Sequence, residues 1–121
     1  MARTALTALA RRGEELAGAH YERLGFTVLA RNHRTRRGEI DLIVCDGRTL
    51  AFVEVKTRCS GSGHPFEAIH PGKQRRIRLL AREWLAGAPG ARADELRFDA
   101  VGVILDARGQ LLRLDHIEAA F

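Results

Sequence analysis

Apolar residues recur along the chain with two different spacings, and each spacing predicts one type of secondary structure. Between residues 5 and 24 they lie three or four positions apart, which predicts an amphipathic helix that ends at Gly25. Gly13 and Gly18 interrupt this helix, which indicates either close packing or a weakly formed first turn. The same spacing begins again after Pro71, a favourable first residue of a helix, and predicts a second helix.

The other apolar segments are short and rich in Val, Ile, Leu and Phe, which is typical of strands. Asp46-Gly47 is a strong hairpin signal between two of them, and Gly109 lies in the turn of a second hairpin. The polar, basic segment 32–38 is expected to be a loop, as is the Gly-, Ser-, Pro- and His-rich segment 59–72. The expected strands cover residues 26–31, 39–45, 49–57, 97–106 and 110–115.

The element order α-β-β-β-α-β-β defines the expected fold class. The helix between the third and fourth strands permits a crossover connection, so the sheet is expected to be mixed. We therefore predict an α/β fold with a central sheet of about five strands flanked by two main helices. At 121 residues the chain has the length of one domain, which is expected to span residues 1–121.

The composition is that of a globular protein, with 45% hydrophobic and 29% charged residues. No apolar run approaches the roughly 20 residues that a membrane span requires, and residues 1–20 lack the apolar stretch of a secretory signal. We therefore expect a cytoplasmic protein without a membrane partner. Cys45 and Cys59 are too few for a disulfide scaffold and are expected to be reduced. Cys59, His64 and His70 lack the spacing of a zinc site.

The charge balance points to a class of partner. Lys and Arg number 20 against 15 Asp and Glu, which gives a net charge of +5 and a pI near 10.2. Such a charge is typical of proteins that bind a phosphate backbone, but arginine-rich proteomes also produce it, so the charge alone decides nothing. The basic residues gather in three groups, which are Arg11 and Arg12; Arg31, Arg34, Arg36 and Arg37; and Lys73, Arg75, Arg76, Arg78 and Arg82.

Charged residues within the central hairpin indicate a candidate site. Glu54 and Lys56 are two positions apart and therefore share one face of their strand. A two-residue loop would pair Asp41 with Phe52 and a four-residue loop would pair it with Glu54, and both place Asp41 on that face. Adjacent carboxylates repel unless a cation or a proton intervenes, and Mg²⁺ prefers such oxygen ligands. The alternative is an ion-pair cluster in which Lys56 neutralises Glu54, Asp41 or Glu39, and residue types and register leave both interpretations open.

The segments GEIDLI at 38–43 and FVEVKTR at 52–58 resemble the PD-(D/E)xK motif of restriction-endonuclease-like nucleases, with Ile40 in place of the proline. The blocks GEELA, LGFTVLARNHR, RFDAVGV and HIEAAF extend the match over almost the whole chain, which is identified as a member of the YraN family of bacterial predicted endonucleases. This resemblance implies a restriction-endonuclease-like core, related in fold to archaeal Holliday junction resolvases. It also implies Mg²⁺-dependent hydrolysis of phosphodiester bonds, with Mn²⁺ as a substitute.

The resemblance also assigns residues to the site. Glu14 lies eleven residues before Gly25-Phe26, the place where the junction resolvases carry a further glutamate, and is a candidate metal ligand. Glu39 is expected to support the ligands. The implied catalytic residues are Asp41, Glu54 and Lys56, and the implied metal ligands are Asp41, Glu54 and the backbone carbonyl of Val55.

These assignments predict a metal-dependent endonuclease that acts on nucleic acid, most simply DNA, and selects branched structures rather than a sequence. We recognise no base-reading element, so the expected contacts are with the backbone. The alternative is a nucleic-acid-binding module that keeps the nuclease fold without activity; a protein–protein adaptor has only the apolar stripe of the second helix in its favour. The sequence leaves the oligomeric state open, and the resemblance to the junction resolvases, which work as dimers, makes a homodimer one possibility. The residues expected to bind the backbone are Arg31, Arg34, Arg36, Arg37, Arg58, Lys73 and Arg76.

Overall fold

The computed structural model describes residues 2–60, 69–88 and 93–121 and has the predicted order of elements. Most of the loop expected over 59–72 falls at 61–68, outside the described residues. In the described part of the chain, neither helix combines the length and the apolar character needed to cross a membrane. The elements are α1 (Ala2–Arg23), β1 (Thr27–Thr35), β2 (Gly38–Cys45), β3 (Thr49–Cys59), α2 (Pro71–Ala86), β4 (Glu95–Leu105) and β5 (Leu111–Ile117).

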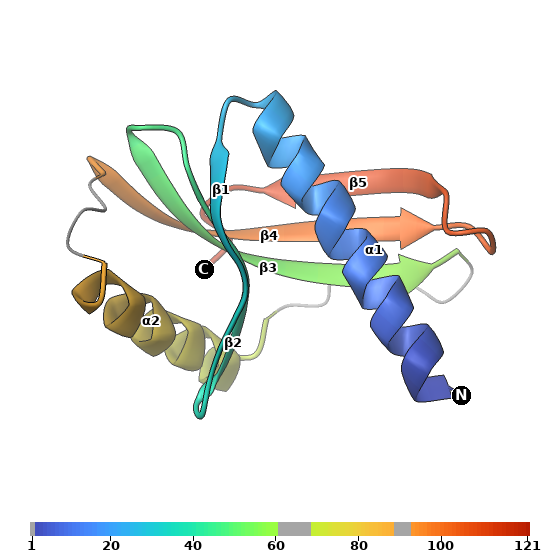
Figure 1. The fold of residues 1–121 in the computed structure, drawn as a ribbon, viewed down its shortest axis with the longest axis horizontal. Coiled ribbons are helices and arrows are strands. Elements are labelled where there is room, and N and C mark those ends of the chain that lie inside the picture. Colours follow the sequence, from blue (N-terminus) through green and yellow to red (C-terminus); the bar gives the residue numbers. More distant parts are fainter. Residues whose placement is uncertain (1, 61–68, 89–92) are drawn as a thin grey trace.

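The five strands form one mixed sheet in the order β1-β2-β3-β4-β5. Strands β3 and β4 run parallel, and the other neighbouring strands are antiparallel. The parallel pair requires a crossover, and this crossover contains α2. The sheet twists so strongly that β1 and β2 run across the direction of β4 and β5 in Figure 1. The predicted α/β fold with a mixed sheet is thus confirmed and is consistent with a restriction-endonuclease-like core.

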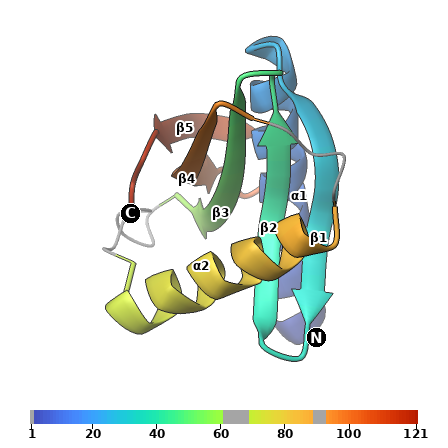
Figure 2. The ribbon, with the colours of Figure 1, turned by 90° about the vertical axis from the view of Figure 1, so that its left-hand side faces the viewer.

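The two helices cover opposite faces of the sheet (Figures 1 and 2). On one face α1 contributes Tyr21 to a hydrophobic core, and on the other α2 contributes Ile77 and Leu80 to a second core. Successive residues of β3 alternate between these cores, with Val53 in the first and Phe52 in the second. Because the first half of β3 is buried on both faces, its sequence there is almost continuously apolar.

Helix α1 approaches β3 closely beside the charged part of that strand. Gly13 is buried, and a Cβ atom at this position would clash with Oγ1 of Thr57. A Cβ atom at Gly18 would lie 2.7 Å from Nη1 of Arg31. At Gly13 close packing is therefore the interpretation that the structure confirms. At Gly18 the neighbouring atoms are the end of a flexible arginine side chain, which can move aside. The contact at Gly13 also brings Glu14, the next residue of α1, to the sheet.

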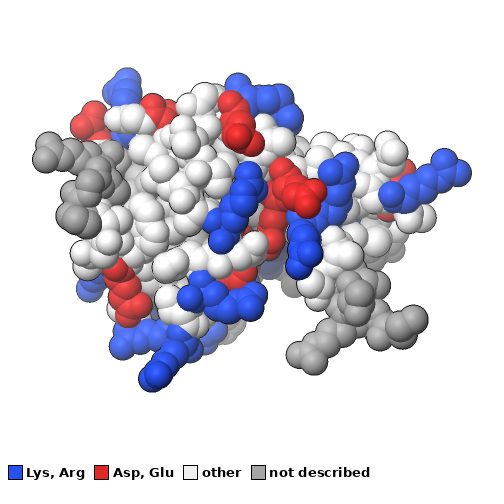
Figure 3. Space-filling view, in the orientation of Figure 1, with Lys and Arg blue, Asp and Glu red and all other residues white. Residues whose placement is uncertain are grey.

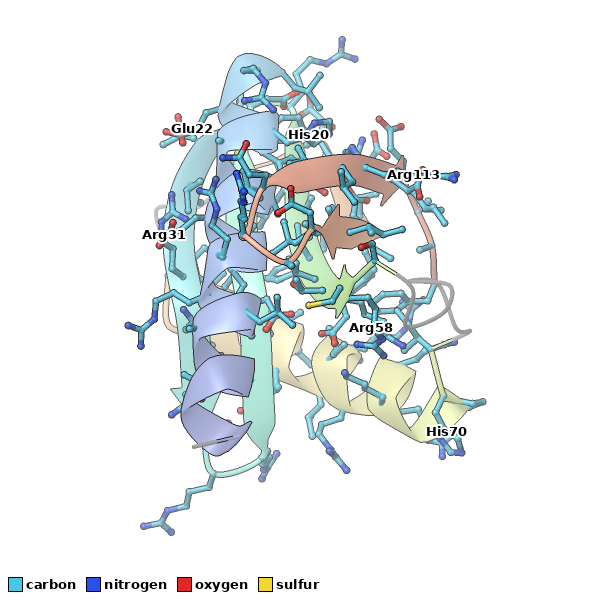
Figure 4. The ribbon with its side chains drawn as sticks, turned by 90° about the vertical axis from the view of Figure 1, so that its right-hand side faces the viewer. His20, Glu22, Arg31, Arg58, His70 and Arg113 are labelled. Atoms are coloured by element: carbon cyan, nitrogen blue, oxygen red, sulfur yellow. The ribbon has the colours of Figure 1, made fainter. Side chains whose placement is uncertain are left out.

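A buried polar network fastens the C-terminal half of α1 to β4 and β5. Asp99 of β4 is fully buried and accepts hydrogen bonds from the Tyr21 hydroxyl at 2.7 Å and from Nε of Arg97 at 2.8 Å. Nε2 of His116 lies 2.9 Å from Oδ2 of Asp99. His20 faces β5 in Figure 4, and its Nε2 lies 3.0 Å from Nδ1 of His116. The blocks RFDAVGV and HIEAAF thus meet in one cluster with the end of α1, which is distant from both in the sequence.

The loop predicted over residues 32–38 is largely wrong, because β1 continues to Thr35 and only residues 36 and 37 connect it to β2. Strand β1 lies at the edge of the sheet, so much of its polar side-chain surface is solvated, as the alternating exposure along the strand shows. Such a polar strand is difficult to distinguish from a loop by sequence. Asn32 has a left-handed backbone with a φ of 49°, and the regular pairing with β2 skips this residue.

Candidate metal centre

The β2–β3 hairpin carries the charged residues that the sequence singles out. Its loop has four residues, because Cys45 pairs with Leu50, and this is one of the two registers that the sequence allows. The backbone pairing of the two strands ends at Leu42, the residue that follows Asp41 in the chain. From there the Asp41 side chain continues the contact, since its Oδ2 accepts a hydrogen bond from the backbone N–H of Val55 at 2.8 Å. Asp41 therefore lies against the backbone of the E-x-K segment, where the strands separate.

Three carboxylates converge at this point, and we refer to Glu14, Glu39 and Asp41 as the acidic cluster. Glu14 comes from α1, whereas Glu39 and Asp41 come from β2. One carboxylate oxygen of each residue lies within 4.8 Å of those of the other two, and all three residues are partly buried. The structure thus brings together the predicted ligands Glu14 and Asp41, and it places Glu39 within the same group.

Asn32 of β1 adds an amide to the acidic cluster, although the sequence analysis does not single it out. With its amide nitrogen turned toward the carboxylates, it donates hydrogen bonds to Oε1 of Glu39 at 2.7 Å and to Oε1 of Glu14 at 2.9 Å. Asparagine tolerates a left-handed backbone better than most residues. An asparagine in the middle of a predicted strand would have marked Asn32 as a candidate site residue, but the sequence predicts a loop for this segment.

The acidic cluster is electrostatically unfavourable when its carboxylates are ionised. Burial, followed by the negative charge of Glu54, raises the pKa of Asp41 to about 8. Burial and the charge of Glu39 likewise raise the pKa of Glu14 above its usual value. A divalent cation would compensate these charges, and carboxylate oxygens are the ligands that Mg²⁺ and Mn²⁺ prefer. The donor set therefore fits a hard divalent cation.

Glu54 lies near Asp41 but has a different partner. It is only 6% exposed, and its Oε1 accepts a hydrogen bond from Nζ of Lys73, in the first turn of α2. Its charge raises the pKa of Asp41, but its carboxylate does not belong to the group whose oxygens lie within 4.8 Å of one another. Lys73, which the sequence predicts only as a residue that binds nucleic acid, is thus an ion-pair partner of Glu54.

Two hollows open at the surface beside these residues. One, the acidic pocket, has a volume of about 590 Å³, and its lining includes Glu14, Asn32 and Glu39. The other, the basic pocket, has a volume of about 410 Å³ and is lined by Leu9, Ala10, Glu54, Val55, Lys56, Thr57, Arg58 and Lys73. Ala10 of α1 lines both pockets, so they are neighbours. On the face that carries α1, acidic side chains near the middle have Lys and Arg side chains on both sides (Figure 3).

Some of the basic residues predicted to bind nucleic acid lie beside these two pockets. Arg31 and Arg58 are on opposite sides of α1 in Figure 4. Arg58 lines the basic pocket together with Lys73. Arg34 lines the acidic pocket and forms an ion pair with Glu39, in which Nη2 of Arg34 lies 3.3 Å from Oε2 of Glu39. Cationic side chains therefore flank the acidic cluster on two sides.

The remaining predicted basic residues lie where α2 meets the turn between β1 and β2. Arg36 and Arg37 form this turn and are exposed, and Nη1 of Arg37 pairs with Glu83 of α2 at 2.6 Å. Arg76 of α2 packs against the same turn, since its Cδ would lie 3.0 Å from a Cβ atom at Gly38. This group is thus tied to α2 and does not line the two pockets.

The fold and the site together define a class of protein. A mixed five-stranded sheet with a helix on each face carries acidic residues and an E-x-K segment at the point where β2 and β3 separate. These features are consistent with the restriction-endonuclease-like class of α/β proteins.

Within this class the chain belongs to the family described as Uncharacterised protein family UPF0102, whose model matches residues 13–103. It is 47% identical over 115 residues to a UPF0102 protein of Anaeromyxobacter dehalogenans, covering 94% of this chain and 84% of the relative. A UPF0102 protein of Rhodococcus jostii is 44% identical, with 94% and 96% covered, and one of Chlorobium phaeobacteroides is 43% identical, with 93% of each covered. The predicted membership of the YraN family is confirmed, and these names state a family without an activity.

Proposed function

We propose that the protein is a metal-dependent endonuclease that hydrolyses phosphodiester bonds in nucleic acid. One observation carries the proposal: the carboxylates of Glu14, Glu39 and Asp41 converge within 4.8 Å, beside the E-x-K segment of β3. Carboxylates so close together are unfavourable when ionised unless a cation compensates their charges, and carboxylate-bound metal ions serve phosphodiester hydrolysis in many nucleases. The resemblance to the YraN family implies the same activity.

The metal would be Mg²⁺, with Mn²⁺ as a substitute. Asp41 and Glu14 would hold it, with Glu39 in the same group of oxygens and with Glu54 and the carbonyl of Val55 contributing from β3. Such an ion lowers the pKa of a coordinated water and stabilises the charge that develops on the phosphate. Lys56 lines the basic pocket beside Glu54 and would orient the attacking water and assist the removal of its proton.

The substrate would be held through its phosphates. Arg31 and Arg34 on one side of the acidic cluster, and Arg58 and Lys73 on the other, would pair with the backbone. Such contacts are insensitive to base sequence and weaken as salt increases. We therefore propose selection by nucleic-acid structure, with branched DNA as the first substrate to test. A homodimer would present two such centres to one branch point.

A second candidate function is a nucleic-acid-binding module without catalytic activity. The ion pair between Lys73 and Glu54 favours it, because it neutralises one carboxylate of the E-x-K segment without any metal. In that case the basic pocket would bind phosphates, and the acidic cluster would serve no reaction.

A cleavage screen separates the two functions. Branched, single-stranded and duplex DNA and RNA are incubated with Mg²⁺ or Mn²⁺ and wild-type protein, Asp41→Asn or Lys56→Ala. We expect the wild type to cut, Asp41→Asn to lose both Mn²⁺ affinity and cleavage, and Lys56→Ala to keep Mn²⁺ affinity while cutting about 10²–10⁴-fold more slowly. Asp94→Asn, an exposed acid beside the start of β3, is the matched control. A wild type that binds every substrate and cuts none would establish the module instead.

A further inference from the structure

An ammonium group covers a buried carboxylate of the candidate centre. Nζ of Lys73 donates a hydrogen bond to Oε1 of Glu54. The side chain of Glu54 is 7% exposed, whereas that of Lys73 is 45% exposed, so the lysine reaches inward from the surface. A carboxylate has two oxygens, and this bond engages one of them.

The position of Lys73 in its own helix does not explain its presence. Lys73 is the third residue of α2, which begins at Pro71 and has no acidic residue in its first turn. A cation at a helix N-terminus is electrostatically unfavourable, because the helix dipole is positive there. His70 already caps this end, since its Nδ1 accepts a hydrogen bond from the N–H of Gly72 at 3.0 Å. The favourable interactions of Lys73 must therefore lie outside α2.

The basic pocket offers Lys73 two alternative anionic partners, which are the carboxylate of Glu54 and a phosphate bound from outside. Among the described residues of its lining, three are cationic, Lys56, Arg58 and Lys73, and one, Glu54, is a carboxylate. A volume of about 410 Å³ leaves room for a phosphate group. Arg58 is partly buried, and its Nη1 donates a hydrogen bond to the carbonyl of Thr57 at 3.1 Å, which orients it locally. An anion bound in this pocket would contact the same ammonium group of Lys73 that donates a hydrogen bond to Glu54.

We propose that Lys73 is an exchangeable counter-ion of Glu54, which pairs with this carboxylate in the metal-free protein and moves to a phosphate of the nucleic acid when a divalent cation binds. This inference rests on the proposed function, because it takes the acidic cluster and Glu54 as the place where the cation binds. Cation and ammonium then compete for Glu54, while ammonium and phosphate attract each other. Binding of the metal and of nucleic acid must therefore favour one another, by the same factor in both directions.

Metal and nucleic-acid affinities of Lys73→Gln test this coupling without any reaction. Mn²⁺ binding to the DNA-free protein is followed by electron paramagnetic resonance. Binding of a fluorescently labelled branched DNA is followed by anisotropy at fixed salt, with Ca²⁺ and with EDTA. We expect Lys73→Gln to bind Mn²⁺ about three- to tenfold more tightly than the wild type, the lower end reflecting the solvent exposure of the lysine. We expect the gain in DNA affinity caused by Ca²⁺ to be smaller in the variant.

Two further variants separate the proposed role from general charge effects. Arg82→Gln removes an equal charge from an exposed position on the same helix, and its effect on Mn²⁺ affinity measures the long-range contribution. Lys73→Arg keeps the competing charge and should return Mn²⁺ affinity toward that of the wild type. Thermal unfolding of each variant shows whether it is folded. Lys73→Arg also provides a second measurement if Lys73→Gln does not fold.

Several outcomes would overturn the inference. Weaker Mn²⁺ binding by Lys73→Gln would mean that Lys73 only supports the position of Glu54. A change in Mn²⁺ affinity equal to that caused by Arg82→Gln would mean that Lys73 acts on the metal only through long-range charge. If either of these two results is found while the wild type binds Mn²⁺ and cuts DNA, only the inference fails and the proposed function stands. If it binds Mn²⁺ and DNA but never cuts, the proposed function fails and the affinities still decide the inference. A wild type that binds no Mn²⁺ refutes both.

Discussion

Asp41 on β2 and Asp99 on β4 are two aspartates of the same sheet, and burial is the largest single influence on the pKa of each. Burial alone would raise both values. For Asp99, hydrogen bonds from His116, Arg97 and Tyr21 outweigh burial and hold the pKa well below its usual range. For Asp41 the pKa is raised to about 8, because Glu54 adds to the effect of burial.

The difference lies in what surrounds each carboxylate. Asp99 meets donors from α1, from its own strand, and from the segment around β5, including the N–H of Ala119 at 3.1 Å. Asp41 accepts a hydrogen bond from the N–H of Val55 and otherwise lies among acidic neighbours in the described part of the chain. A carboxylate such as Asp99, which accepts hydrogen bonds from other groups of the protein, is stable in the folded state without a ligand and has a structural role. A carboxylate surrounded by other carboxylates would be stabilised by a cation from outside, as expected of a ligand-binding site.

The largest effect on stability is expected from Asp99→Asn. The substitution leaves the guanidinium of Arg97, which is 11% exposed, without its buried counter-ion, so the free energy of unfolding should fall by about 3–5 kcal/mol. Urea unfolding in EDTA measures this change, with Asp94→Asn as the control at an exposed acid. A loss no greater than that of the control would show that the network around Asp99 does not hold α1 to the sheet.

The same substitution at Asp41 should have the opposite sign. Asp41→Asn removes an unfavourable charge, so it should stabilise the metal-free protein at pH 8 by an amount of the order of 2 kcal/mol. It should also weaken Mn²⁺ binding at least about tenfold, because a ligand is lost. Urea unfolding at pH 8 and pH 5 tests the cause, since at pH 5 the carboxyl of Asp41 is already protonated and the gain should largely disappear. Destabilisation at pH 8 would contradict the electrostatic description of the acidic cluster.

The two aspartates should also give opposite dependences of stability on pH. Between the unfolded pKa of Asp41 near 3.8 and its folded pKa of about 8, the folded protein binds more protons, so the contribution of Asp41 to stability falls as pH rises. The folded pKa of Asp99 is lowered, so its contribution is present above about pH 4 and is lost as pH falls further. Unfolding curves of the wild type and of Asp41→Asn, recorded in EDTA from pH 4 to pH 9, isolate the first effect. Parallel curves would refute it.

The smallest effect concerns Asn32, which donates to two residues of the acidic cluster. Asn32→Gly and Asn32→Ala both remove the amide, but only alanine is strained by the left-handed backbone with its φ of 49°. The alanine variant should therefore be less stable than the glycine variant by about 1 kcal/mol. At Thr27, an exposed residue of the same strand, the order should reverse, because glycine is unfavourable in a regular strand. Thermal unfolding of the four variants measures both differences.

Much of the fold can be predicted from residues that are neighbours in the chain. The spacing of apolar residues and the start at Pro71 locate the second helix, and Asp46-Gly47 locates the central hairpin. The short hairpin loop also limits the register, so Asp41 could be assigned to the site together with Glu54. The extension of β1 through residues 32–35 could not be predicted, because a polar edge strand has the same residue types as a loop.

The amino-acid sequence alone thus determined the elements, their order and the hairpin that carries Asp41 and the E-x-K segment. Only the tertiary structure decided that Glu14 reaches the acidic cluster, that Lys73 of α2 pairs with Glu54, and that Tyr21 meets Asp99 across 78 positions. Elements follow from periodicities within short segments. The partners of a buried charge depend on how each helix lies on the sheet, which is set by contacts such as that of Gly13 with Thr57 and leaves no local pattern in the sequence.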